Sequence, residues 1–556
     1  MTSAVRSFAC ALIFCIVFSG VARAQSEEGI PVNDPLVIAK CASCHARDDR
    51  GNMQRISFAR TTPEAWQDAL KRMILGYGVS VNAPEARSIV KYLSTNHGLA
   101  PEEAKPVMYD TERRVQEETT LPRGGLGTAC TKCHTFARAL SWRRSTDDWK
   151  QFAASHAAQY KVPNEATATF LAKAAPLHTP EWDAWSARKS AVNLAGRWMV
   201  TASILGHGKY FGEMQVVPTG DDEFNTRVTL ISVRDGSKLV RSGHIAVYGG
   251  YAWRGRSKGE NLANGTSPAS GAADDLASET REVLWIAPDQ SSAEGRWFWG
   301  QYQEFGFDVK LTRASSNPTL VAVDRASLKA DSQANRIRVV GYNLPTQIGP
   351  ADLNFGPGLT VRTIVSHTAS EVIADVDVAS DASLGKHDLA LKGSAIPGAL
   401  AIYDRVDYVK VTPESALATF GDATQPRGYQ QFEAIGYQRG ADGKLHTADD
   451  VDLGPVEVNW SLEVFYVAEG VSTDFVGKVS PTGLLTPASQ SPGNNFDVWV
   501  VATAKNDKDR NGRPLVGKCY LVVTVPSYTF AGREYVRDLN KWVDNGPVAA
   551  AQGATK

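Results

Sequence analysis

The sequence has almost no net charge, few cysteines and only one long apolar run. Its 59 Lys and Arg residues against 60 Asp and Glu residues leave a formal charge of −1 over 556 residues. That balance does not suggest a nucleic-acid partner or a polybasic membrane anchor. The apolar run, from Phe8 to Phe18, is shorter than the about 20 residues that span a bilayer. We therefore expect no membrane span.

The flanks of this run are those of a cleavable secretory signal. Arg6 precedes it, and Ala22-Arg23-Ala24 ends it before Gln25. A basic start, a short apolar segment and a small-residue exit are typical of signal peptides. The sequence therefore predicts a signal peptide over residues 1–24 and a soluble, periplasmic mature protein.

The seven cysteines provide no disulfide framework. Cys10 and Cys15 leave with the signal, and Cys519 stands alone in a β-rich run, where we expect a buried unpaired thiol. The other four form two pentapeptides of the type Cys-x-x-Cys-His. These are Cys41-Ala42-Ser43-Cys44-His45 and Cys130-Thr131-Lys132-Cys133-His134.

In an exported protein this pentapeptide is the attachment signal for c-type haem. The two cysteines form thioethers with the haem vinyl groups, and the histidine binds the iron from one side. A four-cysteine zinc site or a pair of disulfides would leave the trailing histidines unexplained. The sequence therefore predicts two covalent haems, held by Cys41 and Cys44 and by Cys130 and Cys133, with His45 and His134 as iron ligands.

The segments after the two motifs resemble each other. Helix-start signals stand at Thr62-Pro63 and at Thr146. Four residues of each predicted helix share one face at the spacing i, i+3, i+4 and i+7. They are Trp66, Ala69, Leu70 and Met73, and Trp149, Phe152, Ala153 and His156. Because thioether and imidazole groups both bind haem iron, we expect Met73 to complete the first haem and His156 the second.

Other residues are alternatives to these distal ligands. Met108 lies in a Pro-flanked connection and could reach a haem as a loop ligand, and His178 is an alternative to His156. His97 ends a helix, where a cation also suits the helix dipole without any metal. Met53 lies too close to His45 in sequence to fold over the opposite haem face. A haem with no sixth ligand is a further alternative.

The predicted fold class is multidomain α + β. Residues 25–190 are expected to form a mostly helical dihaem cytochrome c-like domain of two repeats. Short alternating strands then predict a β-barrel or sandwich over 191–316, an immunoglobulin-like sandwich over 317–400 and a C-terminal β-sandwich over 401–556.

Two acidic segments could suggest calcium. The segment from Asp507 to Gly512 begins like an EF-hand loop, but Lys518 stands where the loop requires glutamate, which favours a hairpin turn. The segment from Asp442 to Asp452 is ambiguous. No hydrolytic triad, nucleotide loop or metal-water site is recognisable, so we expect no catalytic residue on this chain.

Together these features resemble the α subunit of bacterial quinohaemoprotein amine dehydrogenase. The resemblance covers essentially the whole mature chain and rests on the order of the predicted domains, the two haem motifs and five β-rich stretches. Those stretches run from Gly249 to Gly255, Val339 to Pro345, Phe432 to Ala434, Gly440 to Asp450 and Val498 to Thr503.

This resemblance implies a heterotrimer. In that family a small subunit carries a cysteine tryptophylquinone that oxidises primary amines, and a β-propeller subunit completes the assembly. The α subunit passes electrons through its two haems to a soluble acceptor such as a blue copper protein or a cytochrome c. The alternatives are a free-standing periplasmic dihaem electron carrier and a dihaem peroxidase with one open iron site.

The order of electron flow follows from the predicted ligands. A thioether stabilises ferrous iron more than a second imidazole does, so methionine ligation raises the haem potential. We therefore expect electrons to reach the His134/His156 haem first and the His45/Met73 haem second.

Overall fold

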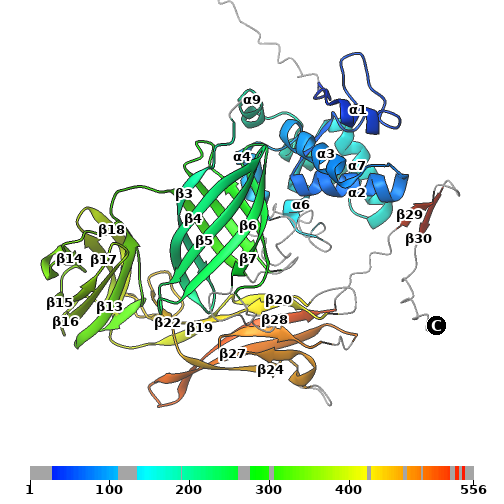
Figure 1. Cartoon of the computed structure of the whole chain (residues 1–556). Helices are drawn as coiled ribbons and strands as arrows, with labels where there is room; N and C mark the ends of the chain where they lie inside the picture. The colour runs from blue at the N-terminus through cyan, green and yellow to red at the C-terminus, as the bar shows by residue number, and fades with distance from the viewer. Residues whose placement is uncertain are drawn as a thin grey trace, which may run out of the picture.

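The computed structural model describes residues 28–109, 130, 134–188, 191–260, 276–299, 306–421, 427–466, 472–489, 493–525, 533–536 and 541–544. The predicted signal peptide and Cys133 lie outside these residues. Within these ranges, no helix is both long and apolar enough to cross a membrane. The chain is multidomain, with several β-sheets and one helical part (Figure 1).

The helical part lies in residues 35–186 and consists of two sets of helices. The first set is α1 (Pro35–Cys41), α2 (Pro63–Tyr77), α3 (Ala83–Asn96), α4 (Pro101–Ala104) and η1 (Lys105–Val107). The second is α6 (Phe136–Leu140), α7 (Thr146–Tyr160), α8 (Asn164–Ala174) and α9 (Pro180–Ser186). Thr62 caps α2 as predicted, since its side chain accepts from Ala65 N at 3.3 Å. The cap of α7 is Ser145, which accepts from Asp148 N at 3.2 Å.

The two sets are joined by a short ribbon and repeat the same contacts. Strand β1 (Ala59–Thr61) pairs antiparallel with β2 (Trp142–Arg144), and Arg60 lies opposite Arg143. The indole N–H of Trp66 donates to the carbonyl of His97 at 2.9 Å. The indole N–H of Trp149 donates to the carbonyl of Ala175 at 2.7 Å. Both carbonyls belong to the residue that ends the following helix.

Eight antiparallel strands form a closed barrel, so this segment is a barrel and not a sandwich. Closure leaves no unpaired sheet edge. Its core contains the fully buried rings of Trp198, Trp253 and Trp297. The strands are β3 (Gly196–Ile204), β4 (Gly208–Gly220), β5 (Glu223–Ser232), β6 (Lys238–Tyr248), β7 (Ala252–Glu260), β8 (Thr280–Ile286), β9 (Ser292–Phe298) and β10 (Gly306–Arg313).

The next unit consists of two four-stranded sheets around one apolar core, which contains Ile337, Phe355 and Val376. One sheet has the order β11-β13-β16-β15 and the other β12-β18-β17-β14. The elements are β11 (Thr319–Val323), β12 (Ser327–Lys329), β13 (Ser332–Tyr342), η3 (Pro350–Asp352), β14 (Leu353–Asn354), β15 (Leu359–His367), β16 (Glu371–Val378), β17 (Gly385–Leu391) and β18 (Ser394–Tyr403).

Three further sheets form the last large unit, with the orders β19-β22-β23, β20-β28-β27-β24 and β21-β26-β25. Its elements are β19 (Tyr408–Thr412), β20 (Ser415–Thr419), β21 (Gln430–Gln431), β22 (Glu433–Gln438), β23 (Val451–Pro455), β24 (Val458–Val464), η4 (Thr473–Phe475), β25 (Gly477–Val479), β26 (Leu484–Pro487), β27 (Phe496–Lys508) and β28 (Pro514–Thr524). A hairpin of β29 (Arg533–Val536) and β30 (Lys541–Asp544) follows, and β29 lies beside α2 (Figure 1).

The two acidic segments form turns. Asp509 accepts from the backbone N–H groups of Asn511 and Arg513 at 2.8 and 2.9 Å, in the hairpin that joins β27 to β28. Asp450 accepts from Tyr408 Oη at 2.8 Å and from Thr447 N at 3.0 Å. No group of three or more His, Cys, Asp or Glu residues within the described ranges is arranged to hold a metal ion.

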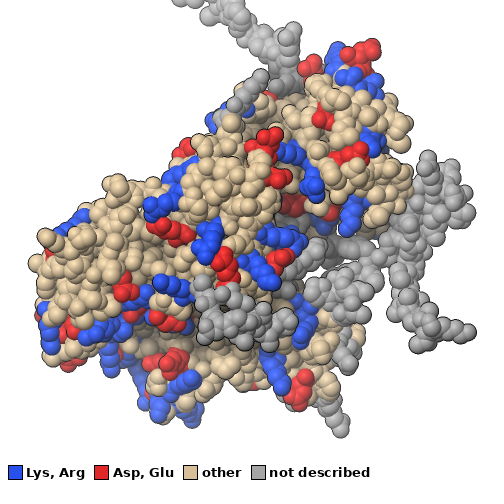
Figure 2. Space-filling model, in the orientation of Figure 1, with Lys and Arg blue, Asp and Glu red and all other residues tan. Residues whose placement is uncertain are grey.

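The helical part packs against the wall of the barrel, as Figure 1 shows. Arg254 of β7 forms an ion pair with Glu64 of α2. The Tyr251 hydroxyl donates to the carbonyl of Leu99 at 2.9 Å, and the Trp285 indole donates to the carbonyl of Pro101 at 2.8 Å. On the face that Figure 2 shows, positive and negative side chains are interspersed, which fits the near-zero net charge.

Candidate haem sites

The first pentapeptide forms a tight turn at the end of α1. Cys41 is the last residue of that helix, and its carbonyl accepts from Cys44 N and His45 N at 3.2 and 2.9 Å. The Cys41 side chain is half-buried and that of Cys44 is exposed, and both are free thiols. Two unpaired thiols held on one turn beside an imidazole have the chemistry needed for thioether attachment.

The ring of His45 is oriented by a backbone carbonyl. Its Nδ1 lies 2.9 Å from the carbonyl oxygen of Gln54. A carbonyl accepts only from a protonated nitrogen, so this contact assigns the proton to Nδ1 and leaves the Nε2 lone pair for a metal. His45 thus has the tautomer that an iron ligand requires.

His134 has the same arrangement, with Nδ1 2.7 Å from the carbonyl oxygen of Thr135. Burial lowers the pKa of His134, and the charge of Arg138 adds to that effect. The neutral imidazole is the form that binds a metal. Of the two cysteines in this pentapeptide, Cys130 is half-buried and free of disulfides, and Cys133 lies outside the described residues.

The rings of His134 and His156 lie together, although they come from different elements. Their centroids are 6.4 Å apart, with an angle of 67° between the ring planes. Metal–imidazole bonds are about 2 Å long, so two rings that bind one ion from opposite sides have centroids roughly 6 Å apart. The spacing of this pair therefore fits one metal ion between the rings, as in a haem with two histidine ligands.

Met73 lies in the last turn of α2 and is half-buried. The apolar core of the first helical set includes Trp66 and Leu70 from the same helix but not Met73. Leu75, with 73% of its surface exposed, and Tyr77 stand beside it as exposed apolar side chains. The described contacts join His134 to His156, and they include none between His45 and Met73.

Three of the alternative ligands are occupied by packing or hydrogen bonds. Met53 is fully buried in the core of the first helical set. Met108 packs against Val283 and Phe298 of the barrel. His178 Nε2 lies 2.6 Å from the carbonyl oxygen of Glu28. These contacts engage all three side chains within the protein.

The interpretation of His97 as a cation at a helix end is wrong. Its side chain is fully buried, and neither ring nitrogen has a hydrogen-bond partner among the residues that the structure describes. Burial, with a contribution from Arg60, lowers the pKa of His97 to about 3. The ring is therefore neutral, and it remains an alternative to Met73.

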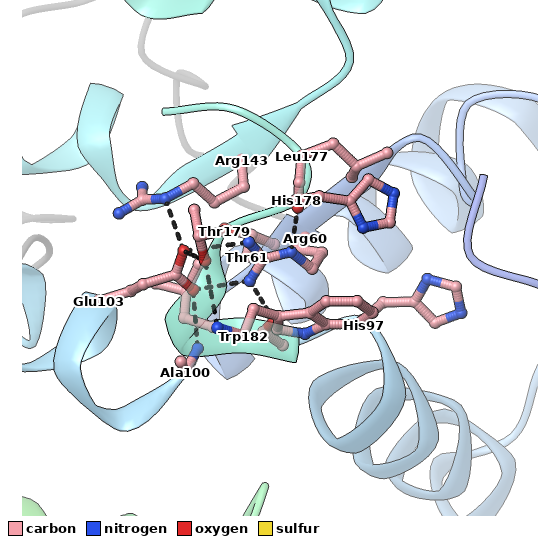
Figure 3. A network of polar contacts seen from close by, with 12 residues as sticks. Arg60, Thr61, His97, Ala100, Glu103, Arg143, Leu177, His178, Thr179 and Trp182 are labelled. Atoms are coloured by element: carbon pink, nitrogen blue, oxygen red, sulfur yellow. Dashed lines mark hydrogen bonds and ion pairs between the residues drawn. The ribbon is translucent and has the colours of Figure 1, made fainter. Parts of the chain in front are cut away.

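A buried ionic network, which the sequence did not suggest, joins the two helical sets (Figure 3). The Glu103 carboxylate accepts from both terminal nitrogens of Arg60, at 2.6 and 3.0 Å, and from Arg143 Nε at 3.1 Å. It also accepts from Thr179 Oγ1 and Ala100 N, both at 2.8 Å. Burial acts to raise the pKa of Glu103, but the hydrogen bonds and charge of Arg60, with the charge of Arg143, hold it at about 2.

One signal in the sequence could have pointed to this network. Arg60 and Arg143 are separated by the same number of residues as Trp66 and Trp149, so they occupy matching places in the two repeats. If the two repeats pair through equivalent strands, Arg60 and Arg143 are expected to lie near each other.

The fold and the site thus define a haem-binding redox subunit built on three β units. Four family models match the chain. They are described as "Quinohemoprotein amine dehydrogenase A, alpha subunit, haem binding" over residues 32–170, and as domains II, III and IV of the quinohemoprotein amine dehydrogenase alpha subunit over residues 191–314, 317–404 and 409–533. The chain therefore belongs to the family of quinohemoprotein amine dehydrogenase alpha subunits. It is a subunit of an oxidoreductase and has a haem-binding domain, as the resemblance implied.

The solved structures that match cover parts of the chain. A redesigned β-barrel, mFAP0, bound to DFHBI, is 14% identical, with a TM-score of 0.17, over 22% of this chain and 98% of that one. The immunoglobulin domains 1–4 of Sidekick-1 are 12% identical, with a TM-score of 0.12, over 60% of this chain and 98% of theirs. A search among curated proteins finds no match.

Proposed function

We propose that this chain is the dihaem electron-transfer subunit of a periplasmic quinohaemoprotein amine dehydrogenase. Family membership supports the assignment to amine oxidation. The observation that carries the electron-transfer role is the His134–His156 pair, whose 6.4 Å spacing suits an iron ion with two imidazole ligands.

Each haem would be held by one pentapeptide. Cys41 and Cys44 would attach the first haem, with His45 and Met73 as iron ligands. Cys130 and Cys133 would attach the second, with His134 and His156 as ligands. When bound, haem iron supplies reversible one-electron chemistry. The Gln54 and Thr135 carbonyls keep His45 and His134 in the metal-binding tautomer.

The amine would be oxidised on a partner subunit. A cysteine tryptophylquinone on a small subunit takes two electrons from a primary amine, and a β-propeller subunit completes the heterotrimer. This chain would then pass the electrons one at a time, through the second haem and then the first, to a soluble blue copper protein or cytochrome c. The chain supplies no catalytic residue.

Purification of the native complex tests this function. We expect this chain to copurify with a small quinone-bearing chain and a propeller chain, and a primary amine to reduce its haem. On a denaturing gel the haem stain should remain on this chain, because thioether bonds survive denaturation. A haem-bearing chain that purifies alone and is not reduced by amines would contradict the proposal and indicate a free-standing electron carrier. Haem that acidified solvent extracts would contradict covalent attachment.

A further inference from the structure

The guanidinium group of Arg144 lies among three aromatic rings beside the second haem site. Its Cζ is 4.3 Å from the ring centroid of Trp142 and 5.6 Å from those of Trp149 and Phe152. Its side chain is 18% exposed. The buried Nε has no hydrogen-bond partner in the described part of the chain. The cation is thus held by aromatic faces together with its ion pair to Asp148.

This cation is close to the proposed iron ligand His156. The Phe152 ring stacks on the His156 ring, with centroids 5.0 Å apart and 25° between the planes. The partner carboxylate of Arg144 is Asp148, at 2.7 Å. Asp148, Phe152 and His156 follow one another at single-turn intervals along α7. Arg144 therefore lies over a ring that stacks on the proposed ligand, and its carboxylate partner Asp148 precedes that ligand by about two helical turns.

Other guanidinium groups lie close enough to Arg144 for their charges to act on it. The pKa of Arg144 is lowered first by burial and then by the charges of Arg72 and Arg55, although Asp148 opposes this. The charge of Arg138 likewise lowers the pKa of Arg72 and the pKa of His134. The carboxylates that oppose these cations are Asp148, beside Arg144, and Asp68, beside Arg72. Among the groups that act on the pKa values of Arg144, Arg72 and His134, guanidinium groups thus outnumber carboxylates.

The first repeat has no counterpart of this cation. The spacing that relates Trp66 to Trp149 also relates Thr61 to Arg144. The Thr61 hydroxyl donates to the carbonyl of Ser141 at 2.8 Å and carries no charge. At this position the second repeat has a charged side chain and the first repeat has an uncharged one.

We propose that Arg144 is a positioning residue that raises the reduction potential of the second haem and so offsets part of the effect of its two histidine ligands. Reduction adds one electron to the ferric haem, and a buried cation nearby stabilises the added negative charge. The electron comes from the partner's quinone, and no bond to Arg144 forms or breaks. The inference rests on the proposed function.

The consequence concerns the step between the two haems. With two imidazoles alone, the second haem would have a much lower potential than the methionine-ligated first haem. A cation beside the second haem brings the two potentials closer. Electrons still move from the second haem to the first, but less of their free energy is lost before they reach the acceptor.

Redox titration of the holoprotein, followed by optical spectra, tests the proposal. Arg144→Gln should lower the midpoint potential of the bis-histidine haem and shift that of the other haem less. Arg144→Lys, which keeps the charge, should restore most of the difference. Asp148→Asn removes the opposing carboxylate and should raise the same midpoint. Arg227→Gln breaks an exposed ion pair with Glu260 on the barrel and is the matched control, which should shift neither haem.

The midpoint shifts expected for Arg144→Gln and Asp148→Asn have opposite signs, and this distinguishes an electrostatic effect from loosened packing. Packing damage would move the midpoint in the same direction in Arg144→Gln and Asp148→Asn, and that result would overturn the proposal. An unchanged midpoint in Arg144→Gln would also overturn it. If Arg144→Gln does not fold, the midpoint of Asp148→Asn still gives the sign, and a midpoint there that is unchanged or lower would overturn the proposal. Absence of covalent haem at the second pentapeptide, read from a haem-stained gel, would instead overturn the proposed function.

Discussion

At the scale of single residues, the two proposed haem sites differ in the side chain that α2 and α7 present at equivalent positions. Met73 and His156 occupy the same place in the two repeats, and both helices have the cap that fixes their start. In each repeat a tryptophan, a small or apolar residue and the proposed ligand share one face of a single helix. Because this pattern is local, it could be recognised from the sequence.

His156→Ala should remove the sixth ligand of the second haem. We expect its spectrum to change from that of a bis-histidine haem to that of a five-coordinate one that binds carbon monoxide. Visible spectra with and without carbon monoxide measure this. His178→Ala is the matched control, since His178 bonds to the Glu28 carbonyl, and it should leave both haem spectra unchanged. Equal effects of the two variants would contradict the assignment.

Met73→Ala should abolish the methionine-to-iron charge-transfer band at the red end of the spectrum, without changing the bis-histidine haem. The physical reason is that only a thioether ligand gives rise to that band. A band that persists in Met73→Ala would show that another thioether binds the iron and would contradict the assignment of Met73. Absence of the band in the unaltered protein would instead indicate a second imidazole ligand, and His97, whose two ring nitrogens have no described partner, would then be the next residue to replace.

Glu103 makes stability depend on pH. Its pKa falls from an ordinary 4.5 to about 2 on folding, so its contribution is fully present above about pH 4.5 and is lost as the pH falls towards about 2. Glu103→Gln leaves two buried guanidinium groups without their carboxylate and should cost about 3–5 kcal/mol at neutral pH. Denaturant unfolding at several pH values measures both effects.

The matched control for this variant is Glu213→Gln, which breaks the exposed ion pair with Arg197. It should leave the free energy of unfolding almost unchanged, because exposed pairs contribute little. If the free energy of unfolding of Glu103→Gln depends on pH between pH 4.5 and pH 2 just as that of the unaltered protein does, a group other than Glu103 causes this dependence.

At the scale of elements, the two helical sets share the bond from an indole N–H to a helix-ending carbonyl. Trp66→Phe and Trp149→Phe should each destabilise the protein by about 0.5–1.5 kcal/mol, because each removes one of the two hydrogen bonds that the His97 or Ala175 carbonyl accepts. Thermal unfolding of both variants checks this. Trp460→Phe in the C-terminal unit, whose indole makes no described hydrogen bond, is the control. A large cost at one site and none at the other would contradict the equivalence of the repeats.

The helices could be predicted better than the barrel for a physical reason. Caps and the 3.6-residue period are local, and α2 and α7 begin where those signals stand. Closure of the barrel instead depends on β10 pairing with β3, as Asp308 does with Ser203. Alternating strands are compatible with either a barrel or a sandwich, so the sequence left both open. His97 was misread because the sequence does not show that a helix end is buried.

At the scale of the whole molecule, the chain joins a redox part to a large β framework. The contacts between them are buried or partly buried: the Glu64–Arg254 pair, and the Tyr251 and Trp285 hydrogen bonds to the carbonyls of Leu99 and Pro101. The pentapeptides predicted the haem chemistry, because that chemistry lies within five consecutive residues. The Arg60–Glu103–Arg143 network assembles residues from distant parts of the chain, and the matching positions of the two arginines do not identify Glu103 as their partner.

The measurement that tests the central claim most directly is rapid mixing of the purified native complex with a primary amine while both haem spectra are followed. The account predicts that amine reduces the bis-histidine haem first and the methionine-ligated haem afterwards. In His156→Ala, reduction of the methionine-ligated haem should be slowed. Haems that stay oxidised, a methionine-ligated haem that is reduced first, or an unchanged rate in His156→Ala would contradict it.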